Sequence, residues 1–514
     1  MRILIFHGYL LGGTGSNVYN ARLAAAFVRA GHEVHLLCQD REPFDQRWVD
    51  ASGSWDGGAL EVEARTELVR ATVYRPDLGG LLPVYVADRY DGIEARPFPE
   101  LSDAELDRYL ERNVAAVREV AQRARPDVAL ANHLVMGPVA VARGLEGLDV
   151  PYVVKVHGSA LEYTVKPHPR FLPYAREGLA GARAVLVGSR HTAESLWAAM
   201  DDPELARRTR LGPPGVDIEQ FGPRELAAAR AGLGALAERA RSARAGTARA
   251  GTAGSSFARD PAAAADALAG LDPDRDRLVV FVGKLIASKG TELLLAAWPL
   301  VLARVPEARL VVVGFGAFRE GLEQLAADLA AGDLAAARAT RGERGEPLEL
   351  LQAFLDGLGE EEARAYAEAA AALPQRVTWV GRLEHSELAD LIPAAEAMVV
   401  PSTFPEAFGM VAAEAAACGA LPVVARHSGL AEVAETLAGA VPEAARPLLA
   451  FDLGARAVPE LAAALTGWLE APEELRAATR EAMVAVTRER YSWEGVARTV
   501  LAAAQGRLDG LPSP

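Results

Sequence analysis

The feature that most constrains the fold is an alternation of short apolar strands with helical segments, and it occurs twice along the chain. The first series opens with a strand at residues 2–6 (RILIF), followed by a glycine loop and an amphipathic helix over about 16–30. Alternation of this kind predicts a parallel, doubly wound sheet, because parallel neighbours need a crossover connection that is usually a helix. The strands expected in this first series are 2–6, 31–39, 127–132, 151–158 and 184–189.

The second series begins at residues 277–285 (RLVVFVGKL), after a stretch rich in Ala, Arg, Gly and Thr at 230–270. That stretch has few large apolar residues, which is typical of a flexible insertion or linker. The further strands expected are 308–316, 376–383, 397–402 and 420–426. We therefore predict a first α/β domain at 1–212, a linker with a low-complexity insertion at 213–277, a second α/β domain at 278–490, and a last helix at 491–514 capped by Ser492.

Extra helical sequence interrupts the second domain at residues 317–375 and carries no chemical motif. We interpret it as a helical insertion that serves as an acceptor lid or an oligomer contact.

A chain of 514 residues is long enough for two or three domains of ordinary size.

Composition excludes several classes of protein. The formal net charge is −15, from 69 acidic and 54 basic residues, which disfavours nucleic acid as the main ligand. The two cysteines, Cys38 and Cys418, form neither a disulfide framework nor a zinc spacing, and they favour reduced thiols in a cytoplasm. The first residues do not resemble a signal peptide, and no apolar run reaches 18 residues, so we expect a cytoplasmic protein without a transmembrane segment.

A glycine loop, GGTGSN at residues 12–17, lies between the first strand and the first helix. Glycines allow backbone N–H groups to approach an anion at a helix N-terminus. The loop is not a complete dinucleotide fingerprint, because Val18 stands where the third glycine would be. Asp40 does end the second strand, near where a ribose-binding acid would lie, so a nicotinamide-dependent oxidoreductase stays open as an alternative.

Three side chains at strand ends are candidates for chemistry. His157 lies at the end of the strand at 151–158 and is expected to point into a cleft, because ligands of parallel sheets bind at the carboxyl ends of strands. Lys284 and Lys289 straddle the end of the strand at 277–285. Two cations beside a helix N-terminus can hold a diphosphate without a metal.

The segment PSTFPEAFGMVAAEAAACG, residues 401–419, holds two acids eight positions apart. A helix is expected to begin near Gly409 and to end at Cys418, with Glu406 in the preceding loop and Glu414 inside the helix. The N–H groups of residues 408–411 would then be the unpaired donors of a helix start, suited to a phosphate oxygen. An acid near a helix N-terminus is favourable by ~0.3–1 kcal/mol in any protein. That accounts for one acid but not for the glycines and the apolar run beside it.

One acidic segment imitates a metal–nucleotide signature. Residues 272–276 (DPDRD) contain Asp-x-Asp, but they precede an apolar strand instead of following one. We interpret them as a solvated turn.

Together these motifs resemble the retaining glycosyltransferases of family 4, and the resemblance covers nearly the whole chain. It rests on Gly12-Gly13 in the first half and on a larger set in the second half. That set is Gly283-Lys284-Leu285, Lys289-Gly290, Val313-Gly314-x-Gly316, Gly381-Arg382-Leu383, Pro401-Ser402 through Glu414, Pro422-Val423-Val424 and Ser428-Gly429. The family usually carries Arg at the position of Lys284, so charge is kept while bidentate geometry is lost. The resemblance implies a GT-B fold, with two Rossmann-like doubly wound domains facing across a cleft and helical insertions added to them.

The resemblance also implies roles for individual residues. Lys284 and Lys289 would neutralise the donor diphosphate, and Glu406 with the backbone at 408–411 would hold the donor sugar and phosphate. Glu414 would bind the ribose hydroxyls. The remaining donor-site positions it implies are Gly12, Gly13, Gly283, Leu383, Phe408, Gly409, Met410 and Val411, with Leu383 facing the base and Gly13 closing on the phosphates. His157 would touch the sugar from the N-terminal domain, which would otherwise carry the acceptor.

The implied reaction is metal-independent transfer of a hexose from a UDP- or GDP-linked sugar, with retention of configuration and no cofactor beyond the nucleotide-sugar co-substrate. The acceptor stays open between a small molecule, a lipid carrier and a polysaccharide. A GT-B sugar-nucleotide epimerase is the nearest alternative. A non-catalytic sugar-nucleotide sensor is a third, disfavoured by the presence of Lys289, Glu406 and Glu414 together.

Overall fold

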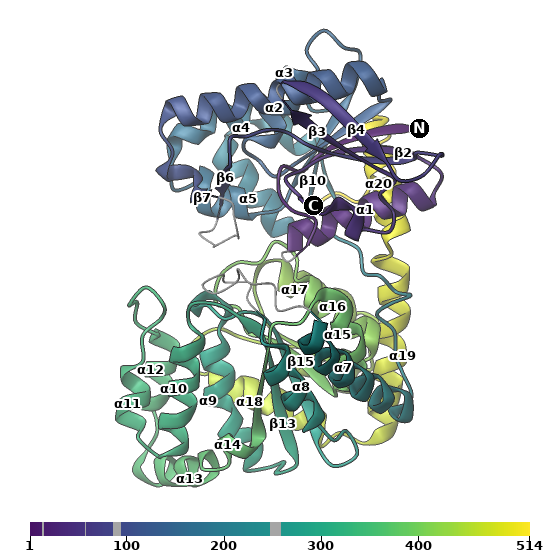
Figure 1. Cartoon of the computed structure of the whole chain (residues 1–514). Helices are drawn as coiled ribbons and strands as arrows, with labels where there is room; N and C mark the ends of the chain where they lie inside the picture. Colours follow the sequence, from purple (N-terminus) through teal and green to yellow (C-terminus); the bar gives the residue numbers. More distant parts are fainter. Residues whose placement is uncertain (13–14, 57, 86–93, 247–258) are drawn as a thin grey trace. The chain divides into compact units, whose positions relative to one another are not determined.

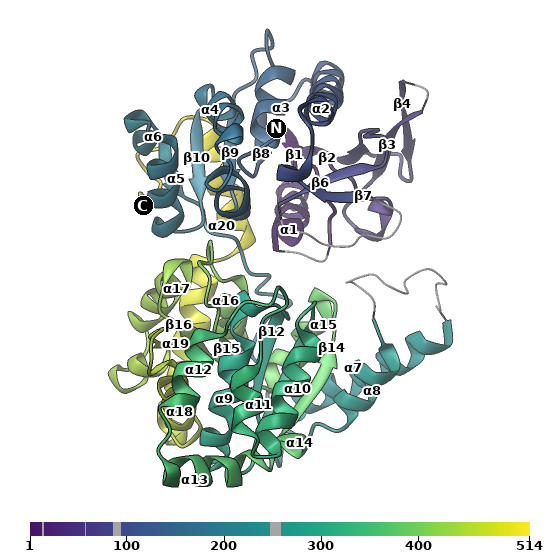
Figure 2. The ribbon, with the colours of Figure 1, turned by 90° about the vertical axis from the view of Figure 1, so that its left-hand side faces the viewer.

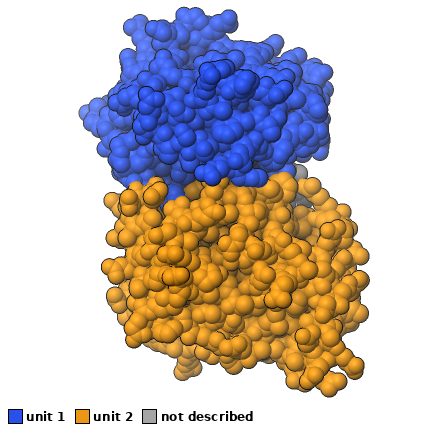
Figure 3. All heavy atoms as spheres, turned by 180° about the vertical axis from the view of Figure 1, so that it is seen from behind, with its two compact units in different colours: residues 1–215, 491–514 blue, residues 216–490 orange. Residues whose placement is uncertain are grey.

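The computed structural model describes residues 1–12, 15–56, 58–85, 94–246 and 259–514 and divides the chain into two compact units (Figures 1 and 3). Unit 1 comprises Met1–Gly215 together with Tyr491–Pro514, and unit 2 comprises Val216–Arg490. The last helix, α20 (Trp493–Ala504), belongs to unit 1, where it packs against α1 (Gly15–Arg29). As expected, Ser492 caps α20 by accepting the Gly495 N–H at 3.3 Å.

A nine-stranded sheet forms the centre of unit 1, and only its outermost pair of strands is antiparallel. Figure 2 shows strands of this sheet side by side. In spatial order they are β11 (Thr209–Leu211), β10 (Ala184–Val187), β9 (Tyr152–Val156), β8 (Val128–Asn132), β1 (Arg2–Phe6), β2 (Glu33–Leu37), β5 (Ala71–Arg75), β3 (Ala51–Asp56) and β4 (Ala59–Ala64). The five strands expected from the sequence are confirmed, and almost all of their residues are buried.

The other elements of unit 1 flank this sheet. The two short strands β6 (Leu81–Val84) and β7 (Glu94–Pro97) pair with each other in parallel. The remaining helices are α2 (Asp103–Ala124), α3 (Gly137–Gly144), α4 (Leu172–Ala180), α5 (Arg190–Met200) and α6 (Pro203–Arg208). Strands β3 to β7 and β11 escaped the sequence prediction. Two of them show why: β4 is almost wholly exposed, and β11 has only three residues, so neither shows a clear apolar pattern.

Unit 2 contains a six-stranded parallel sheet: the five strands of the second alternating series are confirmed, and a sixth, β17 (Ala450–Phe451), has only two residues and was not predicted. Its strands in spatial order are β14 (Val377–Gly381), β13 (Ala308–Phe315), β12 (Arg277–Lys284), β15 (Ala397–Val400), β16 (Leu421–Ala425) and β17 (Ala450–Phe451). Its helices are α7 (Leu226–Gly246), α8 (Pro261–Ala269), α9 (Thr291–Leu302), α10 (Arg319–Ala330), α11 (Leu334–Ala339), α12 (Glu349–Asp356), α13 (Glu360–Ala370), α14 (Leu373–Arg376), α15 (His385–Leu391), α16 (Met410–Cys418), α17 (Ser428–Ala438), α18 (Ala457–Leu469) and α19 (Glu473–Arg490). Each unit is therefore an α/β domain built on its own, mostly parallel sheet, as the two alternating series predict.

The low-complexity segment differs from the expected linker, because most of its described part is helical. Helix α7 packs against α8 and α15, and α8 contacts β14. Alanine is the best helix former and leaves a flat face that packs closely, so a segment poor in large apolar residues can still dock as a helix. The residues of α7 buried in this way are Ala229, Leu233, Leu236, Ala237 and Ala240. Residues 247–258 of the expected linker lie outside the described residues.

The helical insertion is an integral part of unit 2. Figure 2 shows α10, α11 and α12 grouped beside α9, and α12 and α13 both contact α9. The Tyr366 hydroxyl on α13 donates to the carbonyl of Ala296 on α9 at 2.8 Å in a buried position. Leu351 and Phe354 of α12 are buried as well. The insertion therefore extends the helical layer on one side of the sheet.

The acidic turn before β12 is only partly solvated. Asp272 and Asp274 pair with Arg230 on α7, but the Asp276 side chain is only 7 % exposed. Asp276 accepts from Arg309 Nε at 2.6 Å and from Arg376 Nη1 at 3.0 Å. The prediction of a solvated turn is therefore wrong at Asp276, because a buried carboxylate needs cationic partners and here has two.

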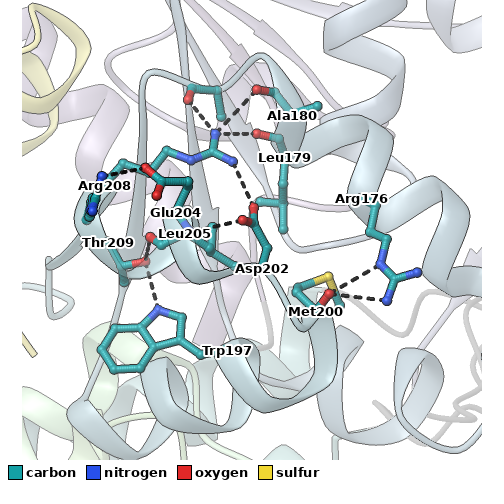
Figure 4. A network of polar contacts seen from close by, with 12 residues as sticks. Arg176, Leu179, Ala180, Trp197, Met200, Asp202, Glu204, Leu205, Arg208 and Thr209 are labelled. Atoms are coloured by element: carbon teal, nitrogen blue, oxygen red, sulfur yellow. Dashed lines mark hydrogen bonds and ion pairs between the residues drawn. The ribbon is translucent and has the colours of Figure 1, made fainter.

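A polar network fastens helices α4, α5 and α6 of unit 1 to strand β11 (Figure 4). Arg208 Nη1 donates to the carbonyls of Leu179 at 2.6 Å and Ala182 at 2.8 Å, at the end of α4. The Trp197 indole donates to Thr209 Oγ1 at 3.0 Å. The last carbonyls of a helix have no partners within the helix, so Arg208 satisfies groups that would otherwise depend on water.

We predict that Arg208→Ala lowers the free energy of unfolding by about 1–3 kcal/mol, because it leaves partly buried carbonyls without donors. The neighbouring Arg207 is 79 % exposed and only pairs with Glu204, so Arg207→Ala should change it by less than about 0.5 kcal/mol. Urea unfolding followed by circular dichroism measures both. Equal effects of the two substitutions would contradict the capping role.

Candidate functional site

The start of helix α16 has the geometry that the sequence predicts. The helix begins at Met410 after Gly409 and ends at Cys418 before Gly419. Gly409 has φ 103°, and a Cβ there would lie against the Leu430 side chain, so this position requires glycine. Phe408 is buried, and the first backbone bond of the helix runs from Ala412 N to Gly409 O. The N–H groups of Met410 and Val411 precede that bond and so have no partner within the helix.

Glu406, in the loop before α16, is held by a lysine and a serine. Its Oε1 pairs with Lys289 Nζ and accepts from Ser402 Oγ at 2.7 Å. Burial raises the pKa of Glu406, but the Lys289 charge and the two hydrogen bonds outweigh it, and the pKa lies below its ordinary value. Glu406 is therefore an ionised acceptor at neutral pH, and its side chain stays 23 % exposed. Ser402 lies in the segment 401–414 that carries the family resemblance, but the sequence did not predict it as a site residue.

The loop after β16 fixes the backbone of Glu406. Ser428 Oγ accepts the Glu406 N–H at 2.9 Å, and the Gly429 N–H donates to the Glu406 carbonyl at 3.0 Å. His427 Nε2 donates to the Ser402 carbonyl at 2.7 Å. A Cβ at Gly429 would come within 2.6 Å of the Phe408 Cα. The Ser428-Gly429 pair noted in the sequence thus acts by holding the Glu406 loop in place.

Glu414 lies inside α16 and is 2 % exposed. Its Oε1 accepts from His385 Nε2 at 2.7 Å, and His385 begins helix α15. The Phe221 ring lies 4.9 Å from the His385 ring. His385 Nδ1 is buried and has no partner among the described residues. His385 was missed because nothing in its local sequence distinguishes it; only the fold brings it to Glu414.

Close backbone contacts join the segment that carries Lys284 and Lys289 to the loop before Glu406 and to the neighbouring strand β13. Lys284 ends β12, and Lys289 ends the 3-10 turn Ala287–Lys289. Gly290 has φ 67°, and any Cβ there would clash with the Pro401 carbonyl. A Cβ on Gly314 would clash with the Gly283 carbonyl. Glycine at both positions therefore allows the ends of β12, β13 and β15 to pack closely, with Leu383 buried in the segment between β14 and α15.

In unit 1, three histidines stand in a row at the carboxyl ends of adjacent strands. His7, His133 and His157 directly follow β1, β8 and β9. The ring of His133 lies 5.5 Å from that of His7 and 4.9 Å from that of His157. His157 Nε2 donates to Asn132 Oδ1 at 2.9 Å. Only His157 was predicted, although the same strand-end position would have indicated His7 and His133.

Burial makes this row neutral. It lowers the pKa of His7 to about 4 and holds the pKa values of His133 and His157 well below their ordinary value, with smaller contributions from neighbouring charges. His7 is satisfied by Asn17, Asn20 and the Leu10 carbonyl. Both ring nitrogens of His133 are buried without a partner among the described residues. The row therefore offers neutral donors and acceptors suited to hydroxyl groups.

The glycine loop of unit 1 is partly described. The Gly12 carbonyl accepts from Asn17 Nδ2 at 2.7 Å, while Gly13 lies outside the described residues. Asp40 Oδ2 accepts the Leu11 N–H at 2.8 Å, and its Oδ1 accepts the Glu42 N–H at 3.0 Å. Asp40 thus supports the start of the loop.

The described residues contain neither a cluster suited to a metal ion nor a helix suited to crossing a membrane. No group of three or more His, Cys, Asp or Glu side chains with the geometry of a metal site occurs in the described ranges. Among the helices described there, none has the length and apolar character needed to cross a membrane.

Comparison with solved structures identifies the class of the fold. Sucrose-phosphate synthase from Thermosynechococcus elongatus superposes with a TM-score of 0.59 at 19 % identity, over 99 % of each chain. HepE from Anabaena, solved with UDP and glucose, superposes with a TM-score of 0.57 at 15 % identity, over 98 % of this chain and 99 % of HepE. The fold is GT-B.

Sequence comparison identifies the family. The Glycosyltransferase Family 4 model matches residues 13–220, and the Glycosyl transferases group 1 model matches residues 348–445. The D-inositol 3-phosphate glycosyltransferase of Segniliparus rotundus is 29 % identical over 58 % of this chain. The matched region spans only 47 % of that relative's own length. The enzyme of the same name from a Nocardioides species is 27 % identical over 78 % of this chain and 76 % of its own length. The chain therefore has the GT-B fold, with a region that matches the Glycosyltransferase Family 4 model followed by one that matches the Glycosyl transferases group 1 model.

Glu292, in the first turn of α9, provides a test of the electrostatics beside the 3-10 turn Ala287–Lys289, which we call the lysine turn. It is 3 % exposed, and its Oε2 has no partner among the described residues. Burial, helped by the charges of Glu343 and Glu346, raises the pKa of Glu292 to about 8. The folded state therefore binds one proton more than the unfolded state between the ordinary glutamate pKa and pH 8, and stability falls as pH rises through that window.

We predict that Glu292→Gln abolishes much of this fall, so that its stability advantage over the wild type grows by a few kcal/mol from pH 5 to pH 8, at about 1.4 kcal/mol per pKa unit. Denaturant unfolding at several pH values measures it. Glu320→Gln, at an exposed position in the first turn of α10, is the matched control and should follow the wild-type profile. A Glu292→Gln profile parallel to the wild type would contradict a neutral buried carboxyl.

Proposed function

We propose that this protein is a retaining glycosyltransferase that moves a hexose from a nucleotide-diphosphate sugar to a hydroxyl-bearing acceptor. The observation that carries the proposal is the ionised Glu406 held by Lys289 and Ser402 at the start of α16, with Glu414 buried farther along the same helix. One helix N-terminus thereby offers donors for phosphate and two acids for hydroxyl groups. We favour a UDP-linked donor over a GDP-linked one, supported by the UDP complex of the HepE structure.

The proposed binding mode assigns a part of the donor to each group. Lys289 and Lys284 neutralise the diphosphate, and the N–H groups at the start of α16 donate to its oxygens. Glu406 accepts from hydroxyls of the hexose. Glu414, oriented by His385, accepts from the ribose hydroxyls. Gly283 and Leu383 line the nucleotide.

The proposed reaction breaks the bond between the anomeric carbon and the phosphate oxygen and forms a bond from that carbon to the acceptor oxygen. Positive charge develops on the sugar and negative charge on the leaving phosphate, as in other glycosyl transfers. Fixed lysines and helix N–H groups stabilise the phosphate charge. The leaving phosphate takes the acceptor's proton on the face from which it departs, so no separate strong base is needed. Resemblance to the retaining family 4 enzymes supports retention of configuration.

We propose that unit 1 carries the acceptor beside the histidine row. Neutral rings that both donate and accept suit hydroxyl groups better than a fixed cation would. His133, whose two ring nitrogens have no partner among the described residues, is proposed to be available to the acceptor. The acceptor stays open, because a D-inositol 3-phosphate glycosyltransferase and a sucrose-phosphate synthase are both similar to this chain.

Two other functions are separable by simple observations. A GT-B epimerase would convert a nucleotide sugar into its isomer without an acceptor, which product analysis detects. A nicotinamide enzyme would need the first glycine loop to hold a dinucleotide. Val18 replaces the third glycine, and Asp40 already accepts the Leu11 and Glu42 N–H groups, which disfavours that function.

We predict that UDP at about 100 times its dissociation constant stabilises the wild type by ~2.7 kcal/mol and raises its melting temperature by about 5 °C. Glu414→Ala should lose most of that rise, measured against its own melting temperature without ligand. Glu435→Ala, an exposed acid on α17, is the control and should keep it. Differential scanning fluorimetry with UDP, GDP and NAD distinguishes the donor classes. Stabilisation by NAD alone would contradict the proposal.

We further predict that a chelator leaves activity unchanged, because lysines and helix N–H groups are proposed to carry the diphosphate charge. Release of UDP from UDP-glucose, measured with and without EDTA, tests this. Activity that EDTA abolishes and magnesium restores would show that the diphosphate needs a metal.

A further inference from the structure

The helical insertion places a small closed loop beside the lysine turn. Residues 342–346 connect α11 to α12, and a bridge between Arg341 and Pro347 closes the loop. Within it, the Gly342 N–H donates to the Glu346 carbonyl at 3.0 Å, and the Gly345 N–H donates to the Gly342 carbonyl at 2.9 Å. We call residues 342–346 the insertion loop.

One side chain of the insertion loop reaches the turn that carries Lys289. Glu343 Oε2 accepts the backbone N–H of Ala287 at 2.8 Å. Ala287 is the first residue of the 3-10 turn that ends at Lys289, and the N–H at such a position has no partner within the turn. Glu343 therefore caps the lysine turn from an element 56 positions away in sequence.

The opposite side of the turn is fixed by the loop that leads to Glu406. The Thr403 N–H donates to the Ser288 carbonyl at 3.0 Å, and Gly290 packs tightly on the Pro401 carbonyl. The insertion is itself anchored, because α12 and α13 pack on α9 and Tyr366 bonds to Ala296. The lysine turn is thus held between a packed insertion on one side and the Glu406 loop on the other.

We infer that Glu343 is a positioning residue for the donor: through the Ala287 N–H it holds the lysine turn so that Lys289 meets the diphosphate. The inference rests on the proposed function and assigns to the insertion a part in donor binding. A carboxylate–amide hydrogen bond is of the stronger, charge-assisted kind, and a turn ordered before the ligand arrives need not be ordered by it. Because burial raises the pKa of the nearby Glu292, this carboxyl is neutral at pH 7 and does not repel the Glu343 carboxylate.

The test compares binding of UDP with binding of uridine by calorimetry, in wild type and variants. Glu343→Ala should weaken UDP binding about tenfold and leave uridine binding within about twofold, because uridine has no phosphate to meet Lys289. Glu343→Gln keeps an oxygen that accepts the Ala287 N–H, so it should stay within about threefold of wild type for both ligands. Glu349→Ala, an exposed acid in the first turn of α12, is the matched control and should bind both as wild type does.

A double variant shows whether Glu343 acts through Lys289. Lys289→Ala alone should weaken UDP binding by more than Glu343→Ala does, and Glu343→Ala/Lys289→Ala should bind no more weakly than Lys289→Ala. Additive losses would overturn the inference, as would equal weakening of UDP and uridine by Glu343→Ala. Tighter UDP binding by Glu343→Ala would show instead that the carboxylate opposes the phosphate. Failure of the wild type to bind UDP or GDP would contradict the proposed function itself, and the inference with it.

Discussion

The contact between Lys289 and Glu406 is the interaction on which the candidate site at the start of α16 is organised. It joins the end of β12 to the loop before α16, two segments 117 positions apart. The surrounding contacts keep these two side chains in place: Ser402 bonds to the Glu406 carboxylate, Ser428 and Gly429 bond to its backbone, and Gly290 lets the lysine turn meet Pro401. The proposed donor chemistry needs this arrangement, since a phosphate and a hexose must meet a cation and an acid a few ångströms apart.

The two units divide the chemistry by charge. Unit 2 presents lysines and the ionised Glu406, which suit a diphosphate and sugar hydroxyls. Unit 1 presents a row of histidines that burial keeps neutral, at the carboxyl ends of three adjacent parallel strands. Ligand sites in such sheets lie at that edge, so both units use the same property of parallel sheets with different side chains.

Local patterns predicted five strands in each unit, the bounds of α16 with its two glycines, and the cap at Ser492. They failed where long-range packing decides. His385 meets Glu414, and Glu343 meets Ala287, only because the fold joins distant segments. The prediction of a flexible linker is wrong for helix α7, because the buried face of that helix is mostly alanine and so gives only a weak hydrophobic pattern. The prediction of a solvated turn is wrong for Asp276, because its partners, Arg309 and Arg376, lie 33 and 100 positions away.

The most direct measurement is the configuration of the first sugar released from UDP-glucose when water replaces the acceptor, followed by proton NMR before mutarotation. The account predicts that α-glucose appears first and that its release falls by at least a hundredfold in Glu406→Gln, since the carboxylate that orients the hexose is lost. Initial release of β-glucose would contradict retention. Undiminished release by Glu406→Gln would contradict the assignment of the site to the start of α16.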